Sequence, residues 1–326
     1  MPGRERMVFR LTGNCTDISP WISVPTEQKK HRVTCMKKQG DTMKIGFIGA
    51  GKVGFSLGKF FVQGGIPVTG YWSRHQGSAQ EAALFTGTNP YDELKALVQD
   101  SDALFLTVPD GTISSVFERL RDLEISGKQI CHCSGAMTVG EAFPGIGQTG
   151  AYGYSIHPLF PISSKLEAYR ELAGAFFCLE DSGPHVSQWR TLLQSLGLTV
   201  QVIPGEAKVR YHAACAISSN LMCALAQESL DLLETCGFSQ QNALQAIAPL
   251  MRSNLEHLLR DGPTQALTGP VERVDADTVA KHLSCFPSRE ERQLYRLASQ
   301  KLAAMAARKH PERSYQSLET LLRQGD

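Results

Sequence analysis

The hydrophobic pattern divides the chain into two regions. Between Lys44 and residue 203, short apolar runs without charge alternate with segments whose apolar residues recur every three or four positions. The first pattern is typical of strands buried on both faces of a sheet, and the second is typical of helices. This alternation predicts an α/β fold with a doubly wound, mostly parallel sheet of the Rossmann type.

After Pro204 we find no convincing strand, and the helical spacing continues to the end of the chain. The sequence therefore predicts a nucleotide-binding domain at 43–203 and an all-helical second domain at 204–326. After a first strand that ends at Ile48, we expect strands at 66–72, 103–108, 129–133, 151–157, 174–179 and 198–203. We expect helices near 78–86, 91–98, 111–121, 164–171, 185–196, 206–236, 239–259, 276–285, 288–308 and 312–324.

Residues 1–42 have no sustained hydrophobic period and hold eight Lys or Arg against four Asp or Glu. They lack the apolar core of a signal peptide, and a transit peptide would be poorer in acids. We expect a disordered N-terminal extension. Because the whole chain has a net charge of only +1, the excess of basic residues lies outside the predicted fold.

Composition narrows the class of protein. An apolar fraction of 42% with 20% charged residues is ordinary for a globular chain, and the small net charge favours no nucleic-acid partner. The nine cysteines form no CxxC pair, which favours reduced thiols in a cytoplasmic protein. The charge-free stretch 211–227 contains His212, Ser218, Ser219 and Asn220, so we interpret it as a buried helix and not a membrane span.

A glycine motif follows the first predicted strand. The sequence Gly49-x-Gly51-x-x-Gly54 leads into a helix whose residues Val53 and Leu57 lie on one apolar face. In dinucleotide sites such glycines permit a tight turn, the approach of a pyrophosphate and close packing of helix on strand. A glycine-rich turn without a ligand is the alternative. The flanking strand and helix favour a cofactor site, formed by Gly49, Ala50, Gly51, Lys52, Val53 and Gly54.

The end of the second strand favours NADP over NAD. NAD sites usually place a carboxylate there, whereas this chain has Trp72-Ser73-Arg74. Ser73 can donate a hydrogen bond and Arg74 can pair with a 2′-phosphate. A merely polar turn is the alternative interpretation.

Three further loops follow strand ends, where open α/β sheets bind ligands. Val108, Pro109 and Asp110 are predicted to contact the cofactor, and Ser134 and Gly135 an anionic substrate, although Ser134 is equally suited to cap a helix. Pro158 keeps the chain extended after His157, which directs that imidazole toward the same crevice. No metal site is expected, since Cys131 and Cys133 point to one side of a strand and His132 to the other.

The first long helix of the second domain carries the catalytic candidates Lys208 and His212. Residues four apart differ by roughly 40° and 6 Å along a helix, so both side chains can meet one substrate. Asn220 lies about 18 Å beyond Lys208 on a straight helix, which suits the far end of a substrate better than the reacting atom. A snorkelling surface lysine is the alternative.

Several segments together resemble a known family. GFIGAGKVG, LTVPDGTI, HCSGAMT, SIHPLFP, KVRYHAACAISSN and LTGPVERVDADTVAKHL look like Rossmann-like oxidoreductases that carry a C-terminal domain of unknown function. These are relatives of the 6-phosphogluconate dehydrogenase-like superfamily and include a ketopantoate reductase type. The resemblance covers residues 43–310 and implies a helical domain that often forms homodimers.

The resemblance also implies roles for individual residues. Lys208 matches the superfamily's catalytic lysine, while His212 stands where an asparagine is expected. The segment from Gly269 to Asp275 resembles a GPxxRGD pattern in which Val274 replaces glycine; Arg273 and Asp275 either reach the cleft or form a turn and a helix cap. The His157-Pro158 pair also resembles prephenate dehydrogenases.

We therefore expect a cytoplasmic oxidoreductase that transfers hydride from NADPH to a small oxo acid, ketopantoate first among the candidates. Lys208 would donate the proton or polarise the oxygen, His212 and Ser134 would orient the substrate, and Asn220 would serve its outer end. Two alternatives are a dehydrogenase of the prephenate or arogenate type with His157 as base, and a sensor that binds NADP without turnover.

Overall fold

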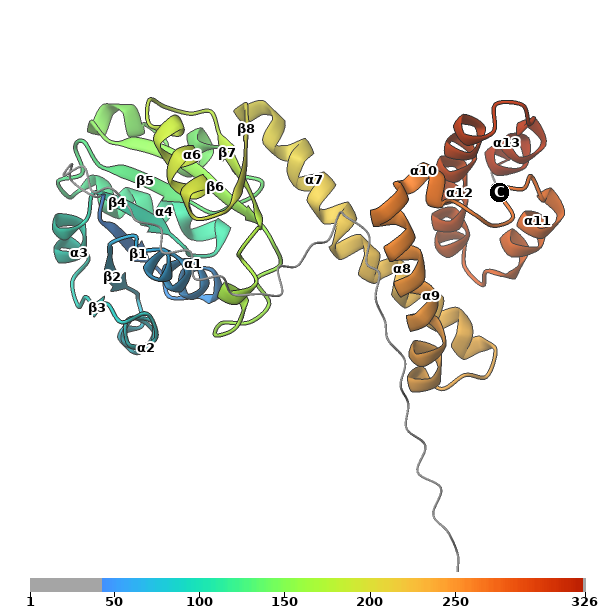
Figure 1. Cartoon of the computed structure of the whole chain (residues 1–326), viewed down its shortest axis with the longest axis horizontal. Coiled ribbons are helices and arrows are strands. Elements are labelled where there is room, and N and C mark those ends of the chain that lie inside the picture. The colour runs from blue at the N-terminus through green and yellow to red at the C-terminus, as the bar shows by residue number, and fades with distance from the viewer. Residues whose placement is uncertain (1–42, 325–326) are drawn as a thin grey trace, which may run out of the picture. The chain divides into compact units, whose positions relative to one another are not determined.

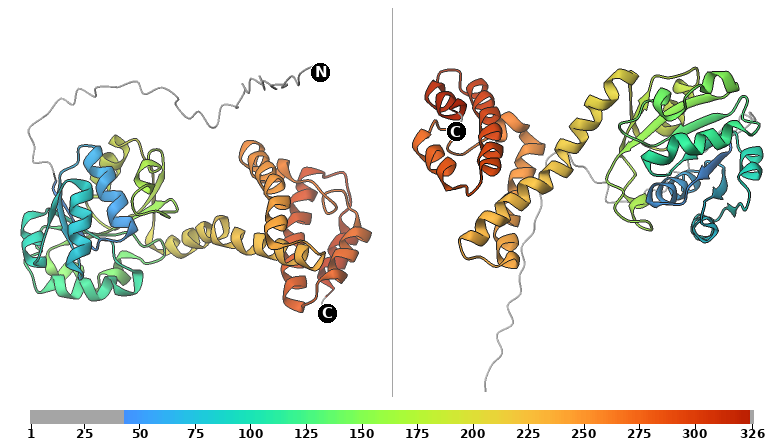
Figure 2. Two further views of the ribbon diagram at one scale, coloured as in Figure 1. Left: turned by 90° about the horizontal axis from the view of Figure 1, so that it is seen from below. Right: turned by 180° about the vertical axis from the view of Figure 1, so that it is seen from behind.

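The computed structural model describes residues 43–324, so the expected disordered extension at 1–42 lies outside the described residues. The described chain forms two compact units, one ending at Met222 and the other beginning at Cys223. Figures 1 and 2 show a sheet with helices in the first unit and helices alone in the second. The α/β class is confirmed.

The N-terminal unit contains one sheet in the order β3-β2-β1-β4-β5-β6-β7-β8. The strands are β1 (Ile45–Ile48), β2 (Val68–Trp72), β3 (Asn89–Pro90), β4 (Ala103–Leu106), β5 (Gln129–His132), β6 (Tyr152–Leu159), β7 (Phe176–Glu180) and β8 (Thr199–Ile203). All neighbouring pairs are parallel except β6 and β7. Parallel pairing of consecutive strands needs a crossover connection, which is usually an α-helix. The connection between β6 and β7 contains no regular α-helix, and these two strands are antiparallel.

Two layers of helices cover the sheet. The helices are α1 (Lys52–Gln63), α2 (Gln76–Thr86), α3 (Leu94–Asp100), α4 (Asp110–Arg121), α5 (Val139–Ala142), α6 (Val186–Ser195) and α7 (Lys208–Ser218). Short 3-10 helices are η1 (Ile146–Thr149), η2 (Ala168–Arg170) and η3 (Gly205–Ala207). Side chains of α1, α2 and α6 pack with Phe47 and Phe105 in one core, and those of α3, α4 and α5 pack with Ile48 and Leu106 in the other. Adjacent strand residues thus face opposite layers, as a doubly wound sheet requires.

The predicted helix at 164–171 is wrong. Only the 3-10 helix η2 forms there, in the connection between β6 and β7. Pro161 lies shortly before this segment, and Leu166 within it is exposed. Without a buried apolar face, a helix this short has little to stabilise it.

The C-terminal unit is helical, as expected. It contains most of α8 (Asn220–Thr235) and then α9 (Gln240–Asp261), α10 (Pro263–Ala266), α11 (Ala276–Cys285), α12 (Arg289–Lys309) and α13 (Gln316–Arg323). Side chains of α11, α12 and α13 share one core, which includes Val279, Leu283, Ala303 and Leu318. A smaller core joins α8 to α9 through Leu230, Ala243 and Ile247. No helix within 43–324 has the length and apolar character to cross a membrane.

The helix expected at 206–236 is interrupted at Ser219. Its φ of −127° and ψ of −80° separate α7 from α8. The hydroxyls of Ser218 and Ser219 both donate to carbonyls one turn earlier, a pattern that bends helices. Lys208 and Tyr211 in the first turn of α7 bond to Ser155 and His157 of β6, and the N-terminal unit extends beyond the expected boundary at residue 203.

Candidate functional site

A cleft of about 440 Å³ opens where β1, β2 and β4 end. Helix α1 begins there, and residues of α4 and of the first turn of α2 also line it. The lining residues are Gly49, Ala50, Gly51, Trp72, Ser73, Arg74, His75, Ser78, Thr107, Val108, Pro109, Thr112, Ser115, Val116 and Arg119. The predicted Lys52, Val53, Gly54 and Asp110 do not line the cleft. No carboxylate is among the lining residues.

The three glycines of the loop occupy different environments. Gly49 has a φ of +102°, and a Cβ there would lie 2.7 Å from the carbonyl oxygen of Thr107. At Gly54 a Cβ would lie 2.6 Å from Thr107 Oγ1 and 2.7 Å from Gly49 O. Both glycines are required by the fold itself.

Gly51 differs from its neighbours. It has an ordinary φ of −86°, and the nearest atom to a Cβ there would be Thr107 O, at 3.9 Å. The protein leaves room for a side chain at this position. The close approach of a ligand to the backbone, at the start of α1, gives the physical reason for a glycine.

Lys208 is the first residue of α7 and lies beside the end of β5 and the middle of β6. It is only 1% exposed, and its Nζ donates hydrogen bonds to Ser134 O at 3.1 Å and Ser155 Oγ at 2.5 Å. No described carboxylate is within ion-pair distance of this amine. Burial therefore lowers the pKa of Lys208, although Glu180 and other more distant groups oppose the shift. The snorkelling interpretation is wrong, because the ammonium is enclosed.

Ser134 connects Lys208 to the start of α4. Its hydroxyl donates to Asp110 Oδ2 at 2.7 Å and accepts from the backbone N–H groups of Ala136 and Met137. The α5 helix begins later, with Thr138 as its N-cap, so Ser134 closes a turn instead of capping a helix. The side chain is 4% exposed.

Two histidines meet at Gly135. A Cβ on residue 135 would lie 2.4 Å from His212 Nδ1 and 2.9 Å from His157 Nε2, so only glycine fits between them. The imidazole rings are 6.0 Å apart, and His157 Nδ1 shares a 2.8 Å hydrogen bond with the hydroxyl of Tyr211. His212 Nδ1 is buried with no hydrogen-bond partner among the described residues. The structure thus places Lys208, His212, Ser134, Gly135 and His157 close together.

Burial sets the protonation of the neighbouring imidazoles. It lowers the pKa of His157 to about 4, with further lowering by the charges of Lys208 and His212. It lowers the pKa of His132, which lies at the end of β5, to about 3, and Lys208 again adds to the shift. Both rings are neutral at pH 7.

Asn220 does not join this cluster. It is exposed at the start of α8, and its Oδ1 accepts a hydrogen bond from Ser219 Oγ. Asp275 also has a local role, because it is the N-cap of α11 and accepts from the N–H of Thr278 at 3.0 Å. Of the two interpretations of that segment, the helix cap describes Asp275.

Two family models match separate parts of the chain. Residues 29–158 match the model of a Rossmann-like domain, and residues 175–302 match a domain of unknown function, DUF2520. Each match covers about two fifths of the chain. The DUF2520 match begins in the sheet, one residue before β7, and extends through most of α12.

Solved structures resemble this chain over most of their length. A Thermotoga maritima protein is 25% identical, with a TM-score of 0.63 over 82% of this chain and 99% of its own. An Aspergillus terreus reductive aminase in complex with NADPH and ethyl-5-oxohexanoate is 16% identical, with a TM-score of 0.53 over 86% and 92%. A Coxiella burnetii pyrroline-5-carboxylate reductase is 14% identical, with a TM-score of 0.54 over 82% and 98%. The last two similarities show a shared fold.

Several residues at these sites were missed from the sequence. Thr112, Ser115 and Arg119 line the cleft from one face of α4, at a spacing that a helical projection from Val108 and Pro109 could have found. Ser155 lies two residues before His157 on β6 and therefore on the same face of the sheet. Tyr211 follows from Lys208 by the same helical reasoning.

Proposed function

We propose that this protein is a reductase that uses NADPH to reduce a small C=O or C=N substrate. The observation that carries the proposal is the cleft, in which the glycine loop and Arg74 meet without any carboxylate. The folds of an NADPH-bound reductive aminase and a pyrroline-5-carboxylate reductase are compatible with this assignment.

The residues present fit the cofactor. The N–H groups at the start of α1 suit the pyrophosphate, and the space beside Gly51 permits its approach. Ser73 and Arg74 suit a 2′-phosphate, whereas the ribose hydroxyls of NAD would find no carboxylate acceptor in the cleft. NADP is therefore the proposed cofactor, and NAD the weaker ligand.

When bound, NADPH supplies the hydride. Lys208 supplies positive charge near the oxygen or nitrogen that becomes negative, and in a buried site such a charge acts strongly. Because the amine is 1% exposed, we assign it to electrostatic stabilisation and proton supply through Ser155, not to direct packing against the substrate. The unpartnered Nδ1 of His212 and the neutral ring of His157 orient the substrate above Gly135.

The test is NADPH oxidation by purified protein with a panel of small oxo acids and cyclic imines. Ketopantoate comes first on the panel, because the sequence resembles a ketopantoate reductase type. Oxidation that depends on the added substrate supports a reductase. Substrate-independent oxidation at the same rate, in the protein and in a buffer blank, argues against catalysis and favours a sensor.

One observation favours a second candidate. The neutral His157, held by Tyr211, has the protonation state of a general base, as a dehydrogenase of the prephenate type would need. This candidate predicts NADP reduction by a hydroxylated acid such as prephenate or arogenate, and loss of that activity in His157→Gln. Activity only in the reductive direction would exclude it.

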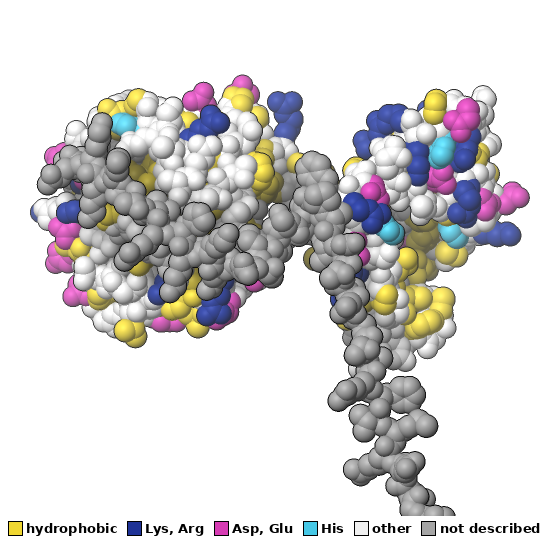
Figure 3. Space-filling view, viewed as in Figure 1, with side chains coloured by type: hydrophobic (Ala, Val, Ile, Leu, Met, Phe, Trp, Pro, Cys, Tyr) yellow, Lys and Arg dark blue, Asp and Glu magenta, His cyan; other side chains and the backbone are white. Residues whose placement is uncertain are grey.

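We also propose a homodimer formed through the helical unit. Leu244, Met251, Leu255 and Leu258 are each at least 41% exposed, and their spacing places them on one face of α9. Figure 3 shows hydrophobic side chains gathered in the α8–α9 part of this unit. A second copy of this face would cover it.

Light scattering tests the dimer. It should give a dimer for the wild type and a monomer for Leu255→Lys, and a wild-type monomer at micromolar concentration would overturn the proposal.

A further inference from the structure

Trp72 lines the cleft proposed for the cofactor. It is the last residue of β2, and its partly buried indole packs against the hydrophobic core beneath α3 and α4. The guanidinium carbon of Arg119, from the last turn of α4, lies 5.0 Å from the centroid of this indole. A cation–π contact of this kind holds an otherwise flexible arginine in one region.

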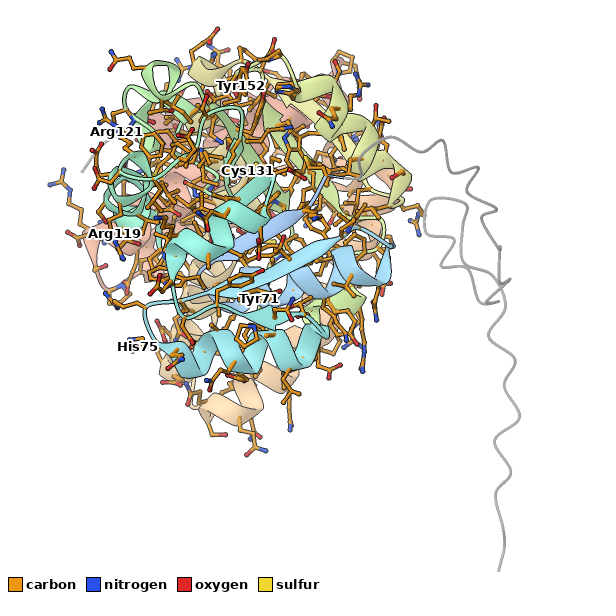
Figure 4. All side chains as sticks on the ribbon, turned by 90° about the vertical axis from the view of Figure 1, so that its left-hand side faces the viewer. Tyr71, His75, Arg119, Arg121, Cys131 and Tyr152 are labelled. Carbon is orange, nitrogen blue, oxygen red and sulfur yellow. The ribbon has the colours of Figure 1, made fainter. Side chains whose placement is uncertain are left out.

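Arg119 and Arg74 both line the cleft, and neither forms an ion pair with a carboxylate of residues 43–324. Arg121, two residues further along α4, behaves differently. All three arginines are exposed, but Arg121 does not line the cleft and pairs with Glu118 at 3.1 Å. Figure 4 labels Arg119, Arg121 and His75, all on the same side of the unit. Two uncompensated guanidinium groups from different elements therefore face one cleft.

The start of α2 adds to this positive environment. Its N-cap, His75, makes no side-chain capping hydrogen bond, and its first turn holds no acidic residue. Ser78, in that turn, lines the cleft beside His75. The unpaired N–H groups of a helix start favour an anion.

We infer that Arg119 is a second 2′-phosphate ligand, which pairs with Arg74 to hold the phosphate monoester of NADPH, while Trp72 positions its guanidinium. The inference rests on the proposed NADPH site and deepens it. The glycine loop and α1 already match the pyrophosphate, so two further cations at the Trp72 end match a separate dianion. A ribose diol without phosphate would gain little from either arginine.

The experiment compares Arg119→Gln with Arg74→Gln and with the matched control Arg121→Gln. Dissociation constants are measured for NADPH and NADH, and for adenosine 2′,5′-bisphosphate and adenosine 5′-monophosphate, which differ only in the 2′-phosphate. Arg119→Gln should weaken NADPH and the bisphosphate at least about tenfold, as loss of a charge-assisted hydrogen bond predicts. NADH and the monophosphate should change less than about twofold, and Arg121→Gln should bind all four as the wild type does.

The outcomes separate the two proposals. Equal weakening of NADPH and NADH by Arg119→Gln would mean that Arg119 contacts the adenine or the pyrophosphate, and would overturn the inference. Unchanged NADPH binding in Arg119→Gln together with weakened binding in Arg74→Gln would overturn it while the NADPH site stands. If the wild type prefers neither NADPH nor the bisphosphate, the cofactor proposal itself fails. Thermal unfolding of each variant shows whether it is folded.

Discussion

Gly51 and Gly54 are three residues apart, yet they answer to different physical demands. A Cβ at residue 54 would collide with Thr107 Oγ1 and with the Gly49 carbonyl, whereas one at residue 51 would meet no protein atom closer than 3.9 Å. Gly54 is required by packing between helix and strand. Gly51 is explained by the close approach of the proposed cofactor.

Gly51→Ala should therefore leave the free energy of unfolding within about 0.5 kcal/mol of the wild type, but weaken NADPH binding at least about tenfold. Gly54→Ala, the matched variant, should lower the free energy of unfolding by about 1–3 kcal/mol through overpacking. Denaturant unfolding and fluorescence titration measure the two effects. Tight NADPH binding by Gly51→Ala would show that the loop does not contact the cofactor closely.

Lys208 is the residue where stability and function should separate. Its buried ammonium bonds to two neutral oxygens and has no carboxylate partner within ion-pair distance among the described residues. Replacing a buried charge by an apolar side chain of similar length is often neutral or stabilising.

Lys208→Met should keep the protein folded while lowering the rate of hydride transfer by about 10²–10⁴-fold, with NADPH affinity nearly unchanged. Single-turnover NADPH oxidation is the measurement, and Lys208→Arg, which keeps the charge, should recover part of the rate. Near-normal chemistry in Lys208→Met would remove Lys208 from the scheme.

The buried imidazoles predict a loss of stability in acid. In the folded state the pKa of His157 is about 4 and that of His132 about 3, both below the ordinary 6.5. The unfolded chain therefore binds more protons at acid pH, and stability falls as the pH is lowered from 6.5 toward 4. Urea unfolding of wild type and His157→Gln between pH 7 and pH 4 checks this. The variant should lose less stability over that range; equal losses would contradict the role of His157.

At the scale of elements, the turn before α11 holds an unusual backbone. Val274 has a φ of +64°, the only non-glycine residue with positive φ among residues 43–324. β-branched residues avoid this region, and this is the position where the resembling pattern has glycine. The partly buried Val274 side chain packs against the core of α11, α12 and α13, which offsets the strain.

This geometry predicts a reversal of the usual order of substitutions. Val274→Ala loses the packing but keeps a Cβ at positive φ, whereas Val274→Gly loses the packing and relieves the strain of about 1–2 kcal/mol. Val274→Gly should therefore be the more stable of the two. Paired denaturant curves decide it, and an Ala variant more stable than the Gly variant would mean that residue 274 is not strained.

Regular elements whose burial leaves a pattern in the sequence could be predicted. In α4 the buried residues recur every three or four positions, and β1 and β4, which are buried on both faces, are continuous apolar runs. The break at Ser219 and the antiparallel β7 could not be predicted in the same way. The first depends on side-chain hydrogen bonds within the helix, and the second on a connection that lacks a crossover helix.

At the scale of the whole molecule, the glycine loop and Lys208 could each be found from the sequence, but the residues that surround them could not. The glycine loop is a local motif, so Gly49 and Gly51 were found from spacing. Ser155, Tyr211 and Arg119 were not found, because each acts through a contact with a residue far away in the sequence. These partners are Lys208, His157 and Trp72 respectively. A helix that begins with a buried lysine also belongs to the sheet unit, which spacing alone could not reveal.

The central claim is that the cleft at the ends of β1, β2 and β4 binds NADPH. Fluorescence titration of the purified wild-type protein with NADPH and with NADH tests it most directly, because the two cofactors differ only in the 2′-phosphate. We predict saturable binding of both, with NADPH tighter by about tenfold or more at moderate salt. Equal or tighter binding of NADH, or no saturable binding of either cofactor, would contradict the account.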